Sequence, residues 1–429
     1  MAFTYDINNP KKDKASSVCL LTTHTISEII NLFLSTFLVG YVYSLSSNVS
    51  NYIFNVGIYY VTMYGASIIT HLIFGYIVAR TNRVWLYRLG VALRAALVVI
   101  CVFCGKDLAR LLPLAGVLSG VSESIYYSAY NTMKQEMVSR HSVKKYVVLS
   151  MILQKFIYIV IPLALGALLD ISTFSQVAIY IAVIAAIQLG ISFGIRSQRP
   201  EGSNFSFKRY FNKLKQNPEL AKKMKLLYLG AIPFGLSTVV GVLLNISIML
   251  QFESNFSLGW LTCVFSVASA IFLVVLNKFT KAGKRTWLLC IISTFPIIGS
   301  VSFAIWPNMA TIIIYNLLNA ISNITYKSIY DIYRTGNLKE AGFYSEIQEH
   351  QTLSETIFSV SRTISFGILL LLGLSQNLIL FKVYFCLASC FYLLTIIVLI
   401  IYERKFIKPA LESSVPQEEP TTETAKAEE

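Results

Sequence analysis

The sequence predicts an all-α integral membrane protein whose 12 transmembrane helices form two pseudo-symmetric six-helix bundles. Of its 429 residues, 55% are hydrophobic and only 14% are charged, whereas a soluble domain carries about 25% charged residues. The apolar runs are long enough to span a bilayer, which requires about 20 residues per helix. The second half of the chain also repeats features of the first half. Together these observations exclude a soluble globular enzyme.

The spanning elements are expected to be helices, because the bilayer interior contains no water to satisfy backbone N–H and C=O groups. Breaks between the apolar runs set the helix boundaries to within a few residues. The predicted segments are 19–44, 52–79, 84–104, 110–134, 145–169, 175–195, 224–251, 256–278, 285–304, 308–333, 351–373 and 378–402.

Charge sets the order and orientation of the parts. The predicted parts are a cytoplasmic segment at 1–18 that is not a cleavable signal sequence, a first bundle at 19–195, a basic linker at 196–223, a second bundle at 224–402 and a disordered cytoplasmic tail at 403–429. Most of the 36 Lys and Arg residues lie in the termini and in every second connection. Because basic loops stay cytoplasmic, we expect a multi-pass protein of the cell membrane with both termini in the cytoplasm.

The linker at 196–223 combines basic residues with Phe205, Tyr210 and Leu214. This mixture favours a helix that lies on the inner membrane surface. The following Asn-Pro-Glu sequence at 217–219 predicts an N-cap, a first-position proline and an acidic first turn for the seventh spanning segment.

The two halves of the chain repeat one another. A shift of 200 positions aligns the fourth predicted segment with the tenth, and a shift of 207 positions places Lys155 on Arg362. The identical pairs in the first alignment are Leu118/Leu318, Ser122/Ser322, Tyr126/Tyr326, Ser128/Ser328 and Tyr130/Tyr330. This pattern indicates a duplicated six-helix unit, an arrangement that is common among secondary transporters.

The connection after the second predicted segment reads GYIVARTNR at 75–83. It resembles the loop pattern G-x-x-x-D-R-x-G-R of the major facilitator superfamily, with Ala79 at the acidic position and Asn82 at the second glycine. Residues 281–285 (KAGKR) are similar to the degraded second copy of that pattern. The resemblance implies two bundles that rock around a midplane site lined mainly by the first, fourth, seventh and tenth helices. The gating-loop residues that it implies are Gly75, Arg80, Arg83, Gly283 and Arg285.

Polar residues near the bilayer midplane mark the predicted substrate site. Burying an ionisable group there costs about 2.5–3.5 kcal/mol on insertion scales, so such groups are expected to line a cavity or to find partners. On the fourth and tenth segments, polar and aromatic residues recur every three or four positions and therefore share one face. The alternative for the tyrosines and asparagines is hydrogen bonding between helices without ligand contact. The predicted substrate-binding residues are Glu123, Tyr126, Tyr130, Asn131, Lys155, Asn323, Tyr326, Lys327, Tyr330 and Arg362.

Lys155 and Arg362 occupy equivalent places in the repeat and are predicted to clamp an anionic group from two sides. The alternative pairs Lys155 with Glu123, and Arg362 with Glu355 or a carbonyl, so that these contacts hold the bundles together. Arg94 lies on a helix that is peripheral in the resembled family, and we expect it to be structural.

Glu28 lies near the middle of the first segment, with His24 one turn away and His71 on the second segment. A carboxylate in a low-dielectric site holds its proton more strongly, and histidine titrates near neutral pH. Glu28 and His24 are therefore predicted to carry a coupling proton. The alternative is that Glu28 balances a buried cation.

These features predict a secondary active transporter that moves a small polar, anionic solute by alternating access, coupled to protons. Its expected partners are the lipid bilayer, the solute and protons. It is expected to be a monomer that uses no nucleic acid, metal or cofactor. An enzyme is not expected, because the sequence has no P-loop, HExxH motif or nucleophile–base pair. The alternatives are a multidrug efflux carrier of the same fold and a membrane sensor or assembly partner that does not transport.

Overall fold

The computed structural model describes residues 10–137, 140–196, 205–279, 286–340 and 346–409. The described part of the first half consists of helices joined by short turns. A π-helical turn at Phe33–Phe37 joins the first two helices, and a 3-10 turn at Gly105–Asp107 joins the fourth and fifth. The helices are α1 (Pro10–Leu32), α2 (Leu38–Leu45), α3 (Val49–Val78), α4 (Arg83–Cys104), α5 (Leu108–Met137), α6 (Arg140–Ile171) and α7 (Phe174–Ser192).

The second half has the same character. The linker contains one short helix, α8 (Phe207–Gln216). The helices that follow are α9 (Pro218–Ser237), α10 (Val239–Phe252), α11 (Asn255–Phe279), α12 (Thr286–Ile305), α13 (Met309–Glu340), α14 (Ile347–Ser375) and α15 (Leu378–Tyr402).

The predicted all-α membrane fold is confirmed. Each predicted segment corresponds to one helix or to two consecutive helices, with α1 and α2 forming the first segment and α9 and α10 the seventh. Asn217 caps α9 as predicted, because its side chain accepts a hydrogen bond from the Leu220 N–H at 3.1 Å and Pro218 is the first helical residue. Within the described residues, ten segments are long and apolar enough to cross a membrane. The count of twelve spans stays a prediction.

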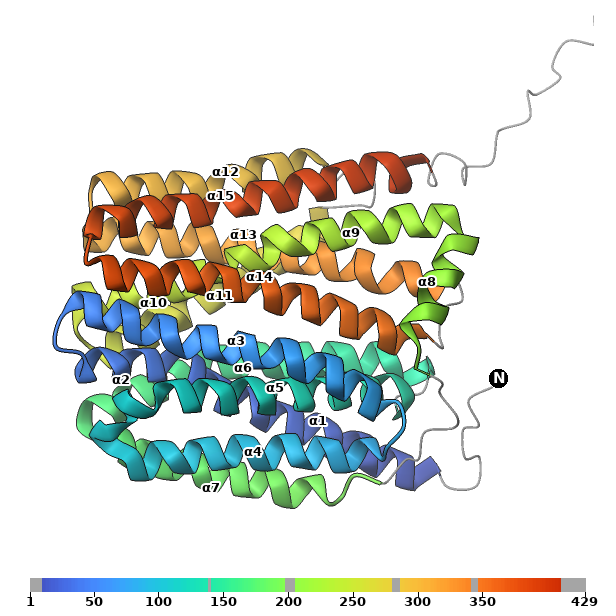
Figure 1. Cartoon of the computed structure of the whole chain (residues 1–429), viewed down its shortest axis with the longest axis horizontal. Coiled ribbons are helices and arrows are strands. Elements are labelled where there is room, and N and C mark those ends of the chain that lie inside the picture. The colour runs from blue at the N-terminus through green and yellow to red at the C-terminus, as the bar shows by residue number, and fades with distance from the viewer. Residues whose placement is uncertain (1–9, 138–139, 197–204, 280–285, 341–345, 410–429) are drawn as a thin grey trace, which may run out of the picture.

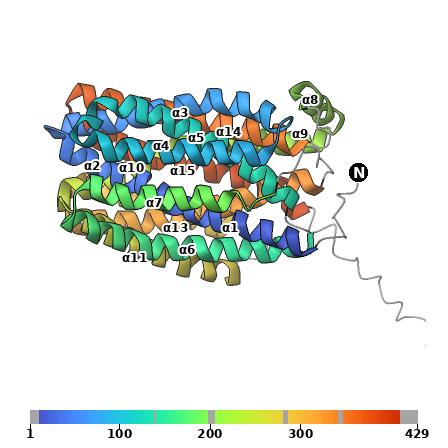
Figure 2. The same ribbon diagram turned by 90° about the horizontal axis from the view of Figure 1, so that it is seen from below.

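The two halves lie side by side, with α1–α7 on one side and α9–α15 on the other (Figure 1). They meet where α3 runs alongside α14, and again where α6 runs alongside α11 (Figure 2). Both contacts depend on glycine. A Cβ added at Gly57 of α3 would lie 2.8 Å from the Leu370 Cα of α14, and one added at Gly259 of α11 would lie 3.2 Å from the Gly166 Cα of α6. The backbones of the two halves therefore approach closely at both contacts.

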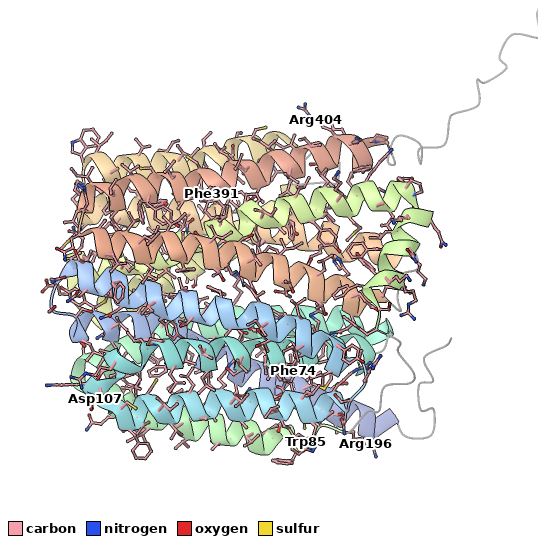
Figure 3. All side chains as sticks on the ribbon, in the orientation of Figure 1. Phe74, Trp85, Asp107, Arg196, Phe391 and Arg404 are labelled. Atoms are coloured by element: carbon pink, nitrogen blue, oxygen red, sulfur yellow. The ribbon has the colours of Figure 1, made fainter. Side chains whose placement is uncertain are left out.

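The two ends of the helix bundle are distinguished by their connections. Asp107 lies at one end and Arg196 near the other (Figure 3). Following the predicted orientation, we name the Asp107 end the outer end and the Arg196 end the inner end. The linker helix α8 lies across the inner end (Figure 1).

The linker helix α8 packs against the second half of the protein, whereas the sequence predicted that it lies on the membrane surface. Tyr210 and Leu214 are buried, and the Tyr210 hydroxyl lies 2.6 Å from the Tyr228 hydroxyl of α9. Burial raises the pKa of Tyr210 to about 12, so its hydroxyl stays protonated. Lys213 forms an ion pair with the buried Glu346 at the start of α14. Buried acidic groups at this place account for the docking of a basic helix onto protein.

The predicted disordered tail begins later than residue 403. Residues Glu403–Ile407 continue α15 as a π-helical turn. Glu403 is fully buried, and the ring centroids of Tyr402 and Phe406 lie 5.4 Å apart. Because the apolar side chains continue the packing of α15, the helix persists past the predicted boundary. The rest of the predicted tail, 410–429, lies outside the described residues.

Candidate functional site

A buried carboxylate of α1 is the centre of a polar cluster in the first half. Glu28 is 3% exposed and accepts hydrogen bonds from three neutral donors on two other helices. Tyr127 of α5 donates to Oε1 at 3.2 Å, and Gln154 and Tyr158 of α6 donate to Oε2 at 3.0 and 3.3 Å. Within the described part of the chain Glu28 forms no ion pair. The arrangement therefore does not support the alternative in which Glu28 balances a cation.

His24 lies one turn before this carboxylate, among tyrosine rings. Its Nδ1 is 3.0 Å from the Tyr126 hydroxyl, and its ring stacks on Tyr130 with the centroids 4.0 Å apart. Arg94 donates to Ser27 at 2.6 Å, and its guanidinium lies 4.9 Å from the centre of the Tyr126 ring. These contacts lie within the first half and agree with the structural role expected for Arg94.

The predicted tyrosines of α5 and α13 are almost fully buried within their own halves. The Tyr326 hydroxyl donates to the Ile292 carbonyl of α12 at 3.4 Å, and the Tyr330 hydroxyl donates to the Leu227 carbonyl of α9 at 3.0 Å. These bonds join neighbouring helices of one half. For Tyr326 and Tyr330 the contacts favour the alternative of hydrogen bonding between helices.

Glu123 of α5 differs from Glu28, because no described residue forms a hydrogen bond or ion pair with its carboxylate. Glu28 and Arg94 of the first half act on it electrostatically, and so do Arg362 and Glu355 of the second half. Glu123 therefore lies close to the boundary between the halves, with both carboxylate oxygens available to water or a ligand.

Two lysines from opposite halves interact through their charges. Lys155 of α6 lies with its Nζ 3.5 Å from the Ser269 Oγ of α11, and the charge of Lys327 on α13 acts on it. Lys327 and Asn323 are exposed, Asn131 of α5 is half-buried, and none of the three bonds to another group among the described residues. The charges of Lys155 and Lys327, one from each half, therefore act on each other, a relation that the sequence did not predict.

Arg362 of α14 also reaches the boundary. Its Nε donates to the Thr238 Oγ1 at 3.4 Å, and its guanidinium lies 5.2 Å from the centre of the Tyr64 ring of α3. Glu355 forms its ion pair with Arg334 of α13 at 3.4 Å. Within the described residues, the alternative ion pairs Lys155–Glu123 and Arg362–Glu355 are not formed, because each cation has a neutral or aromatic neighbour instead.

Sequence reasoning missed several members of these clusters. Gln154 and Tyr158 flank Lys155 and stand four residues apart, so their helical spacing was a usable signal that they share a face. Tyr64 lies in a long apolar helix with no comparable polar pattern. Arg334 continues the polar face of the tenth predicted segment at helical spacing, but the sequence did not indicate that it pairs with Glu355.

The gating-loop residues lie at the inner end. Gly75 of α3 faces Thr352 of α14, where an added Cβ would lie 3.1 Å from the Thr352 Cβ. Arg80 is exposed, whereas Arg83 is buried and its Nε donates to a backbone carbonyl at the end of α3 at 3.4 Å. The remaining two predicted residues, Gly283 and Arg285, lie outside the described residues.

The outer ends of the two halves are held together by two acidic side chains. Tyr43 of α2 donates to Glu253 at 3.2 Å. Asp170 at the end of α6 accepts from the Ser254 hydroxyl at 3.1 Å and from the Phe256 N–H at 3.4 Å. The Phe256 N–H belongs to the first turn of α11, where unpaired N–H groups and the helix dipole favour an anion. These contacts link the outer ends of the two halves.

Replacing Asp170 by alanine is expected to open the outer end more often. Loss of a helix cap lowers stability by about 0.5–2 kcal/mol. If this energy favours the open outer end, a cysteine located inward of Asp170 should be labelled several-fold faster. A Leu258→Cys variant treated with a membrane-impermeant thiol reagent measures this rate. Asp107→Ala, which removes an exposed acid at the same end, serves as the control. Equal labelling with and without Asp170 would show that the cap does not hold the outer ends together.

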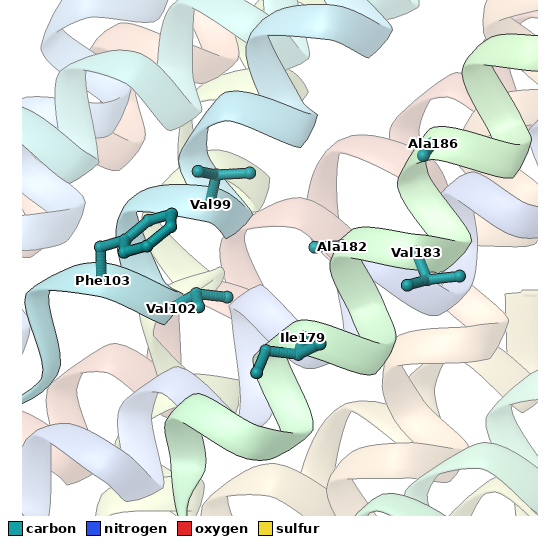
Figure 4. A pocket seen from close by; sticks show the side chains of 7 residues that line it. All are labelled: Val99, Val102, Phe103, Ile179, Ala182, Val183 and Ala186. Atoms are coloured by element: carbon teal, nitrogen blue, oxygen red, sulfur yellow. The ribbon is translucent and has the colours of Figure 1, made fainter.

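A groove of about 330 Å³ between α4 and α7 lies apart from these clusters (Figure 4). The groove lies between α4 and α7, and its lining is apolar. It therefore suits contact with lipid chains rather than with a polar solute. The residues that line it are Val99, Val102, Phe103, Ile179, Ala182, Val183 and Ala186.

Comparisons with known proteins agree with the helical architecture. Residues 18–334 match the family described as Major Facilitator Superfamily. A bacterial homologue of the iron transporter ferroportin in an inward-facing state superposes with a TM-score of 0.65 at 14% identity, covering 92% of this chain and 98% of that chain. The human organic anion transporter MFSD10 (TETRAN) gives a TM-score of 0.59 at 11% identity, covering 90% and 99%. A comparison with curated protein sequences gives no match.

At these identities the two solved structures show the shared fold alone, whereas the family match spans most of the chain. The chain is therefore a multi-pass membrane protein and a secondary transporter that belongs to the Major Facilitator Superfamily.

Proposed function

We propose that this transporter carries a small polar anion across the cell membrane by alternating access, and that protons drive it. The observation that carries the proposal is a set of membrane-embedded cations near the boundary between the halves. Within the described residues, Lys155, Lys327 and Arg362 form no ion pair with an acid. An unpaired cation at bilayer depth costs about 2.5–3.5 kcal/mol on insertion scales. A bound anion supplies the missing countercharge.

The positions of the two lysines support a site that both halves share. Lys155 belongs to the first half and Lys327 to the second, and their charges repel each other. An anion between them turns this repulsion into attraction from both sides. When a ligand contacts both halves, the affinity of the protein for it depends on how the halves are arranged. This dependence is the condition for coupling ligand binding to movement of the halves.

Other side chains near the boundary suit a solute with hydroxyl groups. Glu123 offers carboxylate oxygens, and Asn131 and Asn323 each offer a donor and an acceptor. All three lack a hydrogen-bond partner among the described residues. They support a polar solute over the lipophilic cargo of a multidrug carrier.

We assign the coupling proton to Glu28. The hydroxyls of Tyr127 and Tyr158 now donate to its carboxylate, and a tyrosine hydroxyl accepts as readily as it donates. A protonated Glu28 then donates to one of these hydroxyls after that hydroxyl rotates. The cluster accommodates both charge states without breaking an ion pair. His24, which bonds to Tyr126 one turn away, supports a proton route along α1.

The two structural neighbours are described as an iron transporter homologue and an organic anion transporter, so their likeness does not choose a cargo for this chain. The lysine pair favours an anion, because a basic site repels a metal ion or an organic cation. The cargo is therefore argued from this chain's own residues.

Lys155→Gln and Lys327→Gln are each expected to lower anion uptake about tenfold, because each removes one of the two charges that attract the anion and a loss of about 1.4 kcal/mol in binding is tenfold. Arginine at either position keeps the charge and is expected to retain more uptake than glutamine. Proteoliposome uptake of radiolabelled carboxylates, phosphate esters and amino acids measures the effect, with tetraphenylphosphonium as the cationic comparison.

Lys106→Gln, which removes an exposed lysine at the outer end, is the matched control and should leave uptake unchanged. Anion uptake that is unchanged in both lysine variants would remove the proposed site. Uptake of tetraphenylphosphonium in preference to every anion would favour the multidrug alternative.

A further inference from the structure

Helices α3 and α14 run antiparallel along the boundary between the halves in a fixed register (Figure 1). A Cβ at Gly57 would lie 2.8 Å from the Leu370 Cα, and nearer the inner end a Cβ at Gly75 would lie 3.1 Å from the Thr352 Cβ. Between these two contacts α3 advances 18 residues, from 57 to 75, while α14 goes back 18 residues, from 370 to 352. Each residue of α3 between these contacts therefore lies opposite a particular residue of α14.

Two side-chain contacts between these points follow the same register. Tyr60 stacks on Phe366 with the ring centroids 4.5 Å apart. Arg362 lies over the ring of Tyr64 at 5.2 Å. The register holds in the middle of the interface as well as at its glycine contacts.

The same register places a histidine opposite a carboxylate. His71 lies one turn outward from Gly75 on α3, and Glu355 lies one turn outward from Thr352 on α14. Glu355 is also the first among the charges that act on His71. His71 is buried, so water screens the interaction between the two only weakly. A titratable group of each half thus lies at the same level of the boundary, and the two interact electrostatically.

The groups around this pair come from three helices. The Ser124 Oγ of α5 lies 3.3 Å from the Nε2 of His71. Arg334 of α13 forms an ion pair with Glu355 at 3.4 Å. The charge of Arg362, on α14 itself, acts on both members of the pair.

Protonation changes what this pair contributes. A neutral imidazole has one donor and one acceptor nitrogen, whereas an imidazolium donates from both and carries a positive charge. Ser124 engages the Nε2 of His71, and Glu355 interacts with the imidazole through its charge. With His71 neutral, the ion pair of Glu355 lies within the second half. With His71 protonated, Glu355 also attracts a cation of the first half across the boundary.

We propose that His71 and Glu355 form a second proton-binding site, and that a proton held there keeps the inner ends of α3 and α14 together. Release of this proton toward the cytoplasm removes the attraction and frees the inner end to open. The site is separate from Glu28. The inference rests on the proposed function in one respect, namely that protons drive the transporter.

Arg362 links this proton to the anion. Its positive charge opposes a proton on His71, and an anion bound at Arg362 removes that opposition. Because coupling between two binding sites is reciprocal, a proton at His71 strengthens anion binding by the same factor. The charge of Arg362 also acts on Glu123.

Distance measurement between the inner ends tests the site without a solute. Spin labels at Thr81 and Lys222, which lie on the inner ends of the first and second halves, report the separation by double electron–electron resonance in lipid nanodiscs. Native cysteines are replaced first. From about pH 4 to about pH 8, a range that covers the loss of charge of a buried histidine, the ratio of short to long distances is expected to fall about fivefold. In His71→Gln the ratio should be the same at both values.

Three further variants keep the test decisive. Glu355→Gln should also abolish the pH response. His350→Gln, which removes another buried histidine of α14 that bonds to Tyr228, should keep it, and so should Glu28→Gln. A pH response that survives in both His71→Gln and Glu355→Gln overturns the site. A response that depends on His71 while no pH gradient drives transport supports this site and contradicts the proposed function.

Discussion

Replacing Glu28 by glutamine is expected to abolish accumulation of solute against its gradient while leaving exchange of solute across the membrane intact. Glutamine has nearly the same shape, and its amide can still bond to Tyr127, Gln154 and Tyr158, which surround the carboxylate. It cannot bind or release a proton, so the driving force is no longer transmitted. We expect uptake driven by a pH gradient to fall at least about a hundredfold, since a proton gradient no longer does work, and counterflow to change by less than about threefold.

Proteoliposomes with an imposed pH gradient measure the first quantity, and counterflow of labelled against unlabelled solute measures the second. Glu219→Gln is the matched control, because Glu219 is exposed and pairs only with Lys223 among the described residues, on the surface of α9. Accumulation that survives in Glu28→Gln at the level of this control would show that another group carries the coupling proton.

A single methyl group at Gly57 is expected to weaken the fold strongly. In Gly57→Ala the added Cβ would lie 2.8 Å from the Cα and 2.9 Å from the N of Leu370. Both are backbone atoms, which cannot rotate away as a side chain does. Helices α3 and α14 must therefore move apart, and overpacking of this kind costs about 1–3 kcal/mol. We expect a clear loss of thermal stability in detergent, measured by the temperature at which the monodisperse peak in size-exclusion chromatography is halved.

The same helix supplies the control. A Cβ added at Gly65 of α3 would meet no atom of a neighbouring helix within 4 Å, so Gly65→Ala places a methyl group on the same helix without a clash. This substitution should leave the melting temperature unchanged or raise it slightly, because alanine favours helices. If Gly57→Ala is as stable as Gly65→Ala, the two halves do not pack as closely as the structure indicates.

Much of the fold was predictable from the sequence, because the bilayer imposes a simple pattern. Spanning segments must be apolar and helical, so their positions follow from composition alone. The helix cap formed by Asn217 and Pro218 was equally predictable, since it depends only on residues adjacent in the sequence. The docking of α8 was not, because Tyr210 and Leu214 bury themselves against groups that are distant in the sequence.

The sequence predicted the depth of the site residues in the membrane but not the groups that they contact. The sequence placed Lys155, Lys327 and Arg362 near the midplane, where the cost of a charge makes it conspicuous. Which groups meet depends on how each helix is rotated about its axis and on the register between helices of different halves. A single sequence contains neither quantity. For this reason the contact of Arg362 with Tyr64, and that of Lys155 with Ser269, emerged only from the structure.

The way Asp170 and Glu253 link the two halves at the outer end has a consequence for the medium in which the carrier works. Each acid is held by neutral hydroxyl or amide donors rather than by a lysine or arginine. Dissolved ions screen attraction between full charges over a Debye length of about 8 Å at physiological ionic strength, whereas hydrogen bonds from neutral donors depend less on ionic strength. The contacts at the outer end should therefore hold equally well at high and at low salt concentration, so that a change of salt concentration at that end does not by itself trigger turnover.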